Sequence, residues 1–183
     1  MDSIDLARVE RRARRKYEWA RVRRAVFGFA PALFVVASAA FMNHRSSTAL
    51  VLGAAMFVVG VGLLWYGREL RRAVLPGLAM GLLPLALALC ANHMGHACMG
   101  DRCMTLCVPA CAVGGLGAGI GISLIGLRWK QGWPFWIGAT TLTLLTGAMG
   151  CSCVGYGGVA GLAFGYAVGL LCGFVRRRSS RSL

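Results

Sequence analysis

Charged residues are scarce in this chain, and six long stretches contain none at all. Only 14% of the 183 residues are charged, against about a quarter in ordinary soluble domains. The six stretches without charge are Ala25–Met42, Thr48–Tyr66, Ala73–Ala91, Leu106–Leu127, Trp133–Met149 and Val154–Val175. An apolar run of about 18 residues is long enough to cross the hydrocarbon core of a bilayer. The chain is therefore predicted to be an all-α, polytopic membrane protein with six transmembrane helices in three hairpins.

The sequence also lacks the motifs of most enzymes and pumps. It contains no Ser/His/Asp arrangement, no glycine-rich phosphate loop and no CxxC pair of the kind that lowers a thiol pKa in oxidoreductases. No carboxylate or lysine lies within a predicted span, so a proton-coupled transporter would have no relay. We therefore expect no enzyme activity.

Basic residues are the exception to this scarcity, since the net charge is +14, and their distribution is uneven. Nine of the twenty lie in residues 1–24, and nine more lie in the second and fourth connections and the C-terminal segment. Only Arg45 and Arg102 occupy the other three connections. Because cytoplasmic segments carry an excess of lysine and arginine, both termini are predicted to be cytoplasmic. Membrane anchoring accounts for the charge, so no direct nucleic-acid binding is expected.

The predicted organisation has three parts: a cytoplasmic helix in 1–24, a transmembrane domain in 25–175 with an outer loop in 90–107, and a basic tail in 176–183. The first part carries an apolar stripe at spacings of three and four, formed by Leu6, Val9, Ala13, Tyr17 and Ala20. Two interpretations remain open for this helix. It lies on anionic lipid, or its stripe enters a groove of a cytoplasmic partner.

Glycine recurs at every fourth position of the last predicted span, as Gly157, Gly161, Gly165, Gly169 and Gly173. The fourth span carries two overlapping pairs with the same spacing, Gly115/Gly119 and Gly117/Gly121. Small residues on one face let two membrane helices approach closely. The fourth and sixth spans are therefore predicted to pack together, within one chain or between two copies in a homo-oligomer.

Seven of the eight cysteines fall at the predicted outer ends of the helices or in the outer loops. They are Cys90, Cys98, Cys103, Cys107, Cys111, Cys151 and Cys153. An oxidising outer compartment favours disulfides among them, and the "GCSC" pair is expected to bridge to the outer loop. The eighth, Cys172, is expected to be a packing residue near the cytoplasmic end.

The outer loop also offers a set of soft metal ligands. The candidates are His93, His96, Cys98, Cys103 and Cys107, with Met94, Met99 and Met104 nearby. Imidazole, thiolate and thioether together suit a soft transition metal such as Cu or Zn. Three interpretations of the cysteines remain open: disulfides in a structural or sensing role, a metal site, and cysteines without a specific role.

The architecture resembles that of a known family of regulators. A basic N-terminus beginning "MDSIDLARVERRARRKYEW", six spans in three hairpins, cytoplasmic ends and outer cysteines together look like the six-span bacterial anti-sigma factors. Those proteins hold an extracytoplasmic-function sigma factor at the inner membrane and release it on an outside signal. The resemblance implies that residues 4–24 dock a sigma factor and that the outer cysteines receive the signal.

The leading hypothesis is therefore an inner-membrane regulator that senses a redox or metal signal outside and controls a cytoplasmic partner. A soft-metal transporter or accessory protein is the first alternative. A structural subunit of a larger membrane complex, assembled through its glycine faces, is the second.

Overall fold

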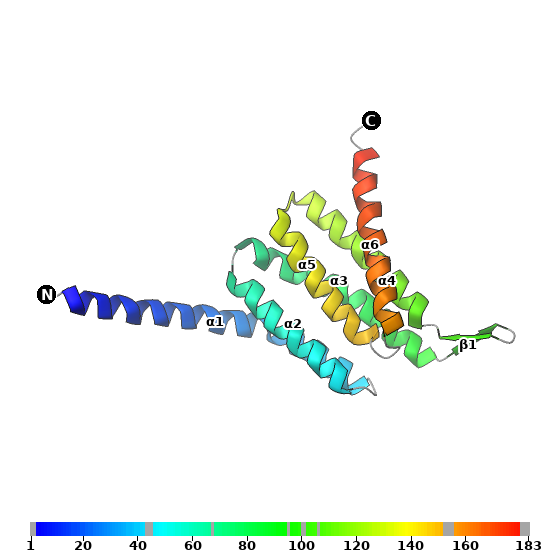
Figure 1. Ribbon diagram of the computed structural model, residues 1–183, viewed down its shortest axis with the longest axis horizontal. Helices are drawn as coiled ribbons and strands as arrows, with labels where there is room; N and C mark the ends of the chain where they lie inside the picture. The colour runs from blue at the N-terminus through cyan, green and yellow to red at the C-terminus, as the bar shows by residue number, and fades with distance from the viewer. Residues whose placement is uncertain are drawn as a thin grey trace.

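The computed structural model describes residues 3–42, 46–66, 68–94, 96–99, 102–105, 107–151 and 156–179. Each of the six apolar stretches corresponds to one helix (Figure 1): α1 (Ser3–Met42), α2 (Ser46–Tyr66), α3 (Arg68–Met94), α4 (Cys107–Arg128), α5 (Trp133–Cys151) and α6 (Tyr156–Ser179). Residue 106, where the fourth predicted stretch begins, and residues 154–155, where the sixth begins, lie outside the described residues. A two-stranded antiparallel hairpin, β1 (His96–Met99) and β2 (Arg102–Thr105), lies between α3 and α4. The prediction of a helical protein is confirmed. The hairpin was not predicted from the sequence.

Three of the described helices are long and apolar enough to cross a membrane. They are Leu70–Ala91, Cys107–Arg128 and Tyr156–Val175, and α2 adds a shorter apolar stretch, Leu50–Tyr66. Within the described ranges this count is three, where the sequence predicted six. α5 is less apolar because it carries four threonines, and more than half of its residues are buried among the other helices. A helix with so little surface to present to lipid does not need the hydropathy of a lipid-facing one.

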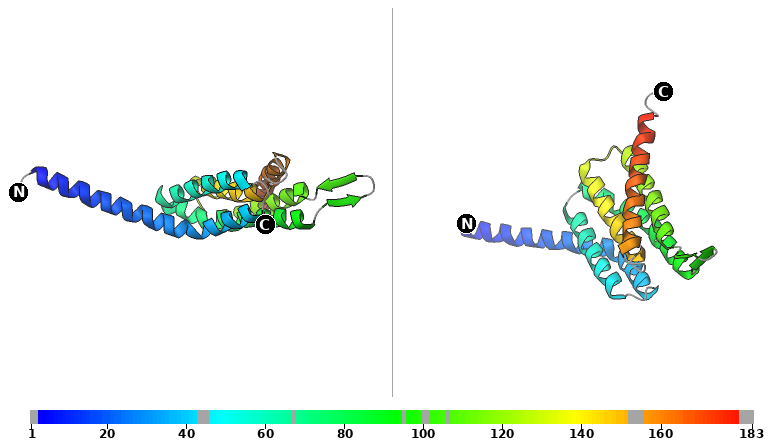
Figure 2. Two further views of the ribbon diagram at one scale, coloured as in Figure 1. Left: turned by 90° about the horizontal axis from the view of Figure 1, so that it is seen from below. Right: turned by 45° about the vertical axis from the view of Figure 1, so that its right-hand side comes forward.

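α1 is one unbroken helix across the boundary predicted at residue 25. Its 40 residues span about 60 Å at 1.5 Å per residue. Residues 11–21 are all exposed, and this half projects away from the bundle as an arm (Figures 1 and 2). In the second half, Phe29 and Ala32 are buried against the bundle. The packed half and the projecting arm therefore belong to one continuous helix.

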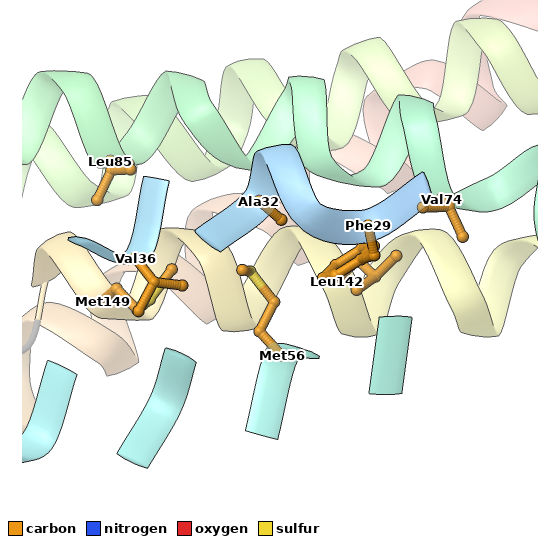
Figure 3. Close-up of a cluster of buried hydrophobic side chains, with 8 residues drawn as sticks. All are labelled: Phe29, Ala32, Val36, Met56, Val74, Leu85, Leu142 and Met149. Carbon is orange, nitrogen blue, oxygen red and sulfur yellow. The ribbon is translucent and has the colours of Figure 1, made fainter. Parts of the chain in front are cut away.

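One core cluster joins α1 and α2 to α3 and α5 (Figure 3). Its buried members are Phe29, Ala32, Val36, Met56, Val74, Leu85, Leu142 and Met149. Glycines of α2 make room for α1, because a Cβ on Gly60 would overlap the Phe29 ring and one on Gly53 would overlap the Val36 side chain. Phe29 also packs edge-on against Phe57, with ring centroids 5.8 Å apart.

α3 and α5 pack closely through small residues and a buried hydroxyl. A Cβ on Gly77 would meet the Ala139 carbonyl oxygen at 3.0 Å, and one on Gly81 would meet the Thr143 carbonyl oxygen at 3.1 Å. The Thr143 hydroxyl donates a hydrogen bond of 3.0 Å to the Gly77 carbonyl oxygen. Backbone contact and a satisfied buried hydroxyl hold the two helices together without charge.

The predicted contact between α4 and α6 is confirmed, and it is the most extensive helix–helix contact in the described chain. A Cβ on Gly115 or Gly119 would overlap the carbonyl oxygens of Leu162 and Tyr166. From the other side, a Cβ on Gly165 or Gly169 would overlap carbonyl oxygens of α4, and one on Gly173 would overlap Ser123. The contact is made within one chain.

Three of the predicted packing glycines behave differently. Gly157 has no neighbour within 4 Å of a built Cβ, so its predicted packing role is wrong. It lies in the first turn of α6, before the two helices converge. Gly117 and Gly121 contact Leu83 and Met80 of α3 instead of α6. This pair is offset by two residues from Gly115/Gly119, and residues two apart on a helix lie on different faces.

The turn between α4 and α5 carries a local strain. α4 ends in a Schellman motif, with hydrogen bonds from Gln131 N to Gly126 O (3.0 Å) and from Lys130 N to Leu127 O (3.4 Å). Lys130 occupies the left-handed position of this motif with φ 48°, where glycine is usual. A lysine in this position costs about 1–2 kcal/mol relative to the right-handed conformation. It retains a positive charge at this end of the bundle.

We predict that Gly119→Ala lowers the free energy of unfolding by about 1–3 kcal/mol, because the new methyl group forces α4 and α6 apart. Gly157→Ala is the matched control, since a Cβ there enters open space, and its effect should stay within about 0.5 kcal/mol. Denaturant unfolding in detergent micelles measures both. Equal effects of the two substitutions would contradict the assigned packing.

Candidate functional site

One end of the bundle, here called the cysteine end, collects most of the chemistry-bearing residues. The helices alternate in direction, so the last turns of α3 and α5 and the first turns of α4 and α6 lie at this end (Figure 1). The hairpin β1–β2 projects from the cysteine end, while the arm of α1 leaves from the other side of the molecule (Figure 2). The arrangement separates the cysteines from most of the basic residues.

A buried disulfide joins α4 to α5 at the cysteine end. It links Cys111 to Cys151, whose Cα atoms lie 6.2 Å apart, and both residues have no exposed surface. Side chains from three helices surround it: Ala88, Ala148 and Leu162. Toward the other end of the two helices, α4 and α5 meet through an apolar cluster that includes Ile122 and Phe135.

The predicted pairing of Cys151 with the outer loop is therefore wrong, because its partner lies in the second turn of α4. α6 packs against this end of α5, since a Cβ on Gly158 would meet the Cys151 carbonyl oxygen at 2.6 Å. That packing and the α4–α6 contact bring Cys111 and Cys151 together. The sequence places Cys107 and Cys111 four residues apart, on one face of α4. Cys111 of this pair forms the disulfide with Cys151.

Three other cysteines whose side chains are described are free thiols. Cys107 is buried one turn before Cys111, and Cys90 is exposed near the end of α3. Cys172 is exposed on α6, so the expectation of a packing residue there is wrong. Cys153 lies outside the described residues.

The hairpin register divides the predicted metal ligands between two faces. Cys98 pairs with Cys103, and His96 pairs with Thr105. Residues two apart on a strand share a face, so His96, Cys98 and Cys103 fall on one face. Met99 and Met104 fall on the opposite face by the same rule. By register, the predicted ligands of the hairpin therefore divide between two faces, where the sequence analysis treated them as one set.

The register fits either a cross-strand disulfide or a shared soft metal ion. Directly opposed residues in an antiparallel pair have Cα atoms about 4.5–5.5 Å apart, which is within the range for disulfides. The side chains of His93, His96, Cys98 and Cys103 lie outside the described part of the structure. Among the side chains that are described, no group of three His, Cys, Asp or Glu could hold a metal ion.

The predicted partner-binding stripe lies on the arm of α1. Ala13, Tyr17 and Ala20 are exposed, with 69% of Tyr17 accessible. Leu6 and Val9 belong to the same helix, and their side chains are not among those described. The described part of the stripe therefore has no cover from the rest of the chain.

Comparison with known proteins gives this chain no family. No family model matches it, and neither the curated proteins nor the solved structures gave a match.

We predict that Cys111→Ser lowers the stability of the bundle by about 2–4 kcal/mol, the usual contribution of a disulfide. Cys90→Ser is the matched control, because that thiol is free and exposed. Thermal unfolding in detergent, with and without reductant, measures the difference. Reductant should lower the melting temperature of the wild type and leave Cys111→Ser unchanged; alkylation of Cys111 in denatured, unreduced wild type would contradict the bond.

Proposed function

We propose that this protein is a six-span regulator of the bacterial inner membrane, with both termini in the cytoplasm and the cysteine end outside. It senses a redox or metal signal at the cysteine end and controls a cytoplasmic partner through the arm of α1. The observation that carries the proposal is the continuity of α1. One helix holds an exposed amphipathic stripe at one end and a buried core contact at the other.

A packed path runs from the cysteine end to the arm. Cys151 ends α5, and Met149 of the same helix belongs to the core cluster that holds Val36 and Phe29 of α1. Met56 of α2 belongs to the same cluster and accepts a hydrogen bond of 3.2 Å from the Thr146 hydroxyl of α5. A change in the packing of α5 would therefore shift α1 and redirect the arm.

The two groups of cysteines take different roles in this proposal. The Cys111–Cys151 disulfide has no exposed surface, so a solute has no access to it and it acts as a permanent connection. The signal falls to Cys98 and Cys103, which face each other across the hairpin with His96 on the same face. Oxidation would join the two sulfurs, and a soft ion would bind between them and the imidazole.

The architecture resembles that of six-span anti-sigma factors, and this resemblance suggests a sigma factor as the partner. The sigma factor would dock on the stripe of the arm. Leu6, Val9, Ala13, Tyr17 and Ala20 would enter a groove of that protein as helical anchors. The basic residues around the stripe would keep the arm close to anionic lipid when it is free.

A soft-metal accessory protein is the second candidate, favoured by the shared face of His96, Cys98 and Cys103. A transport role is less well supported. Within the described residues, Cys111 and Cys151 are joined in a disulfide, and the Met56 sulfur accepts a hydrogen bond from Thr146. None of these three sulfur atoms is therefore free to bind an ion during transport. If this candidate is right, the protein binds Cu or Zn tightly, and removing the arm of α1 does not affect that binding.

The output end is tested by replacing Leu6, Val9 and Tyr17 with serine, which removes the stripe and keeps every charge. We expect the variant to stay in the membrane and to lose capture of the cytoplasmic partner in affinity purification followed by mass spectrometry. Arg12→Gln with Arg15→Gln is the control, since it removes charge from the arm and keeps the stripe. Unchanged capture by the serine variant would contradict docking through the arm.

The input end is tested in the same assay with Cys98→Ser and Cys103→Ser together. Oxidant or added copper should change the captured amount severalfold in the wild type and in Cys90→Ser, and should have no effect in the double variant. A response that survives in the double variant would place the sensor elsewhere. Metal bound by the wild type with no effect on capture would favour the accessory protein.

A further inference from the structure

A basic groove lies where the arm of α1 joins the bundle. Its volume is about 620 Å³, and it is walled by α1 and by single residues from the adjoining ends of α2 and α3. We define the basic groove by its lining residues: Tyr17, Ala20, Arg21, Arg24, Ala25, Gly28, Leu64 and Arg71. Three guanidinium groups from two helices therefore line one concave surface.

The charge of this groove is not neutralised by the described part of the protein. Among the side chains that are described, no carboxylate lines it. The ion pair found among the described residues, Arg14–Glu18, lies on the arm outside the groove. Bringing three guanidinium groups to one cavity costs Coulomb energy unless an anion joins them. The groove is therefore suited to an anionic ligand from outside the chain.

The rest of the lining is apolar, and its position matches the edge of a bilayer. Ala25, Gly28 and Leu64 form the uncharged side. The apolar stretch of α2 ends at Tyr66 and the candidate span of α3 begins at Leu70, next to Arg71. In a bilayer around these helices, the groove lies at the depth where hydrocarbon gives way to headgroups.

We propose that the basic groove binds one anionic phospholipid, with its headgroup phosphate held by Arg21, Arg24 and Arg71. Planar guanidinium groups bind phosphate oxygens in pairs of parallel hydrogen bonds, which suits them to this ligand. The acyl chains continue along the apolar side past Gly28 and Leu64. A free phosphate ion would use the arginines and leave this apolar side empty, which favours the lipid.

Such a lipid would connect α1 to α3 at the base of the arm. The described contacts of α1 are made mainly with α2, so the lipid would add a polar link between α1 and α3 to the apolar contact of the core cluster. The arm would then hold a fixed direction in membranes rich in anionic lipid. This inference does not depend on the proposed sensing role, because the groove lies away from the cysteine end. Tyr17 and Ala20 line the groove and also belong to the stripe of the arm, so the groove adjoins the proposed docking surface.

The test measures lipid binding by the full-length protein in detergent, using native mass spectrometry with phosphatidylglycerol, phosphatidylcholine and inorganic phosphate as separate ligands. We expect one phosphatidylglycerol to bind in preference to phosphatidylcholine. Arg21→Gln with Arg71→Gln should weaken that binding about tenfold or more, as expected when charge-assisted hydrogen bonds to a phosphate are lost. Arg23→Gln with Arg72→Gln is the matched control, since it removes the same charge from residues outside the groove.

A second variant, Gly28→Leu, keeps every charge and fills the apolar side. A Cβ on Gly28 meets only Leu64 Cδ1, at 3.9 Å, so a larger side chain is accommodated in the groove space. This variant should weaken phosphatidylglycerol binding as well. Equal losses in the two arginine pairs would show general surface attraction and overturn the site. Binding of inorganic phosphate as tight as that of the lipid, unaffected by Gly28→Leu, would overturn the lipid as the ligand.

Discussion

Backbone contact between α4 and α6 is the constraint on which the rest of this structure depends. Gly115 and Gly119 of α4 lie against the backbone of α6, and Gly165 and Gly169 of α6 lie against the backbone of α4, so no larger residue would let the helices approach as closely. A second close contact, between Gly158 of α6 and the Cys151 backbone of α5, lies at the cysteine end, and the two contacts together bring Cys151 beside Cys111. The disulfide and the cysteine end are consequences of this packing.

Uncharged contacts hold the described helices together. The helices are held together by glycine contacts, by apolar clusters and by hydroxyl groups such as Thr143, which find backbone acceptors. Charge is left at the ends, and Lys130 stays in a conformation that glycine would adopt more easily. This arrangement is expected where positive charge sets the orientation in a membrane and local stability is secondary.

The sequence predicted the helices well because long apolar runs leave few alternatives, and it predicted the α4–α6 contact because the glycine period is regular. It did not predict that α1 is unbroken, because charge changes abruptly at residue 25 while helix propensity does not. The partner of Cys151 was also missed, since pairing depends on how helices far apart in sequence pack. Likewise, the two faces of the hairpin follow from strand register, which depends on the turn and not on composition.

The central claim is that the cysteine end and the basic end lie on opposite sides of a membrane. The most direct measurement is labelling of intact cells, after mild reduction, with a thiol reagent that does not cross membranes. We predict that Cys98 and Cys103 react in intact cells. A cysteine placed in α6 by Ser179→Cys, on a background that retains only the Cys111–Cys151 pair, should react only once the inner membrane is opened. Labelling of the Ser179→Cys thiol in intact cells, with Cys98 and Cys103 protected, would contradict the account.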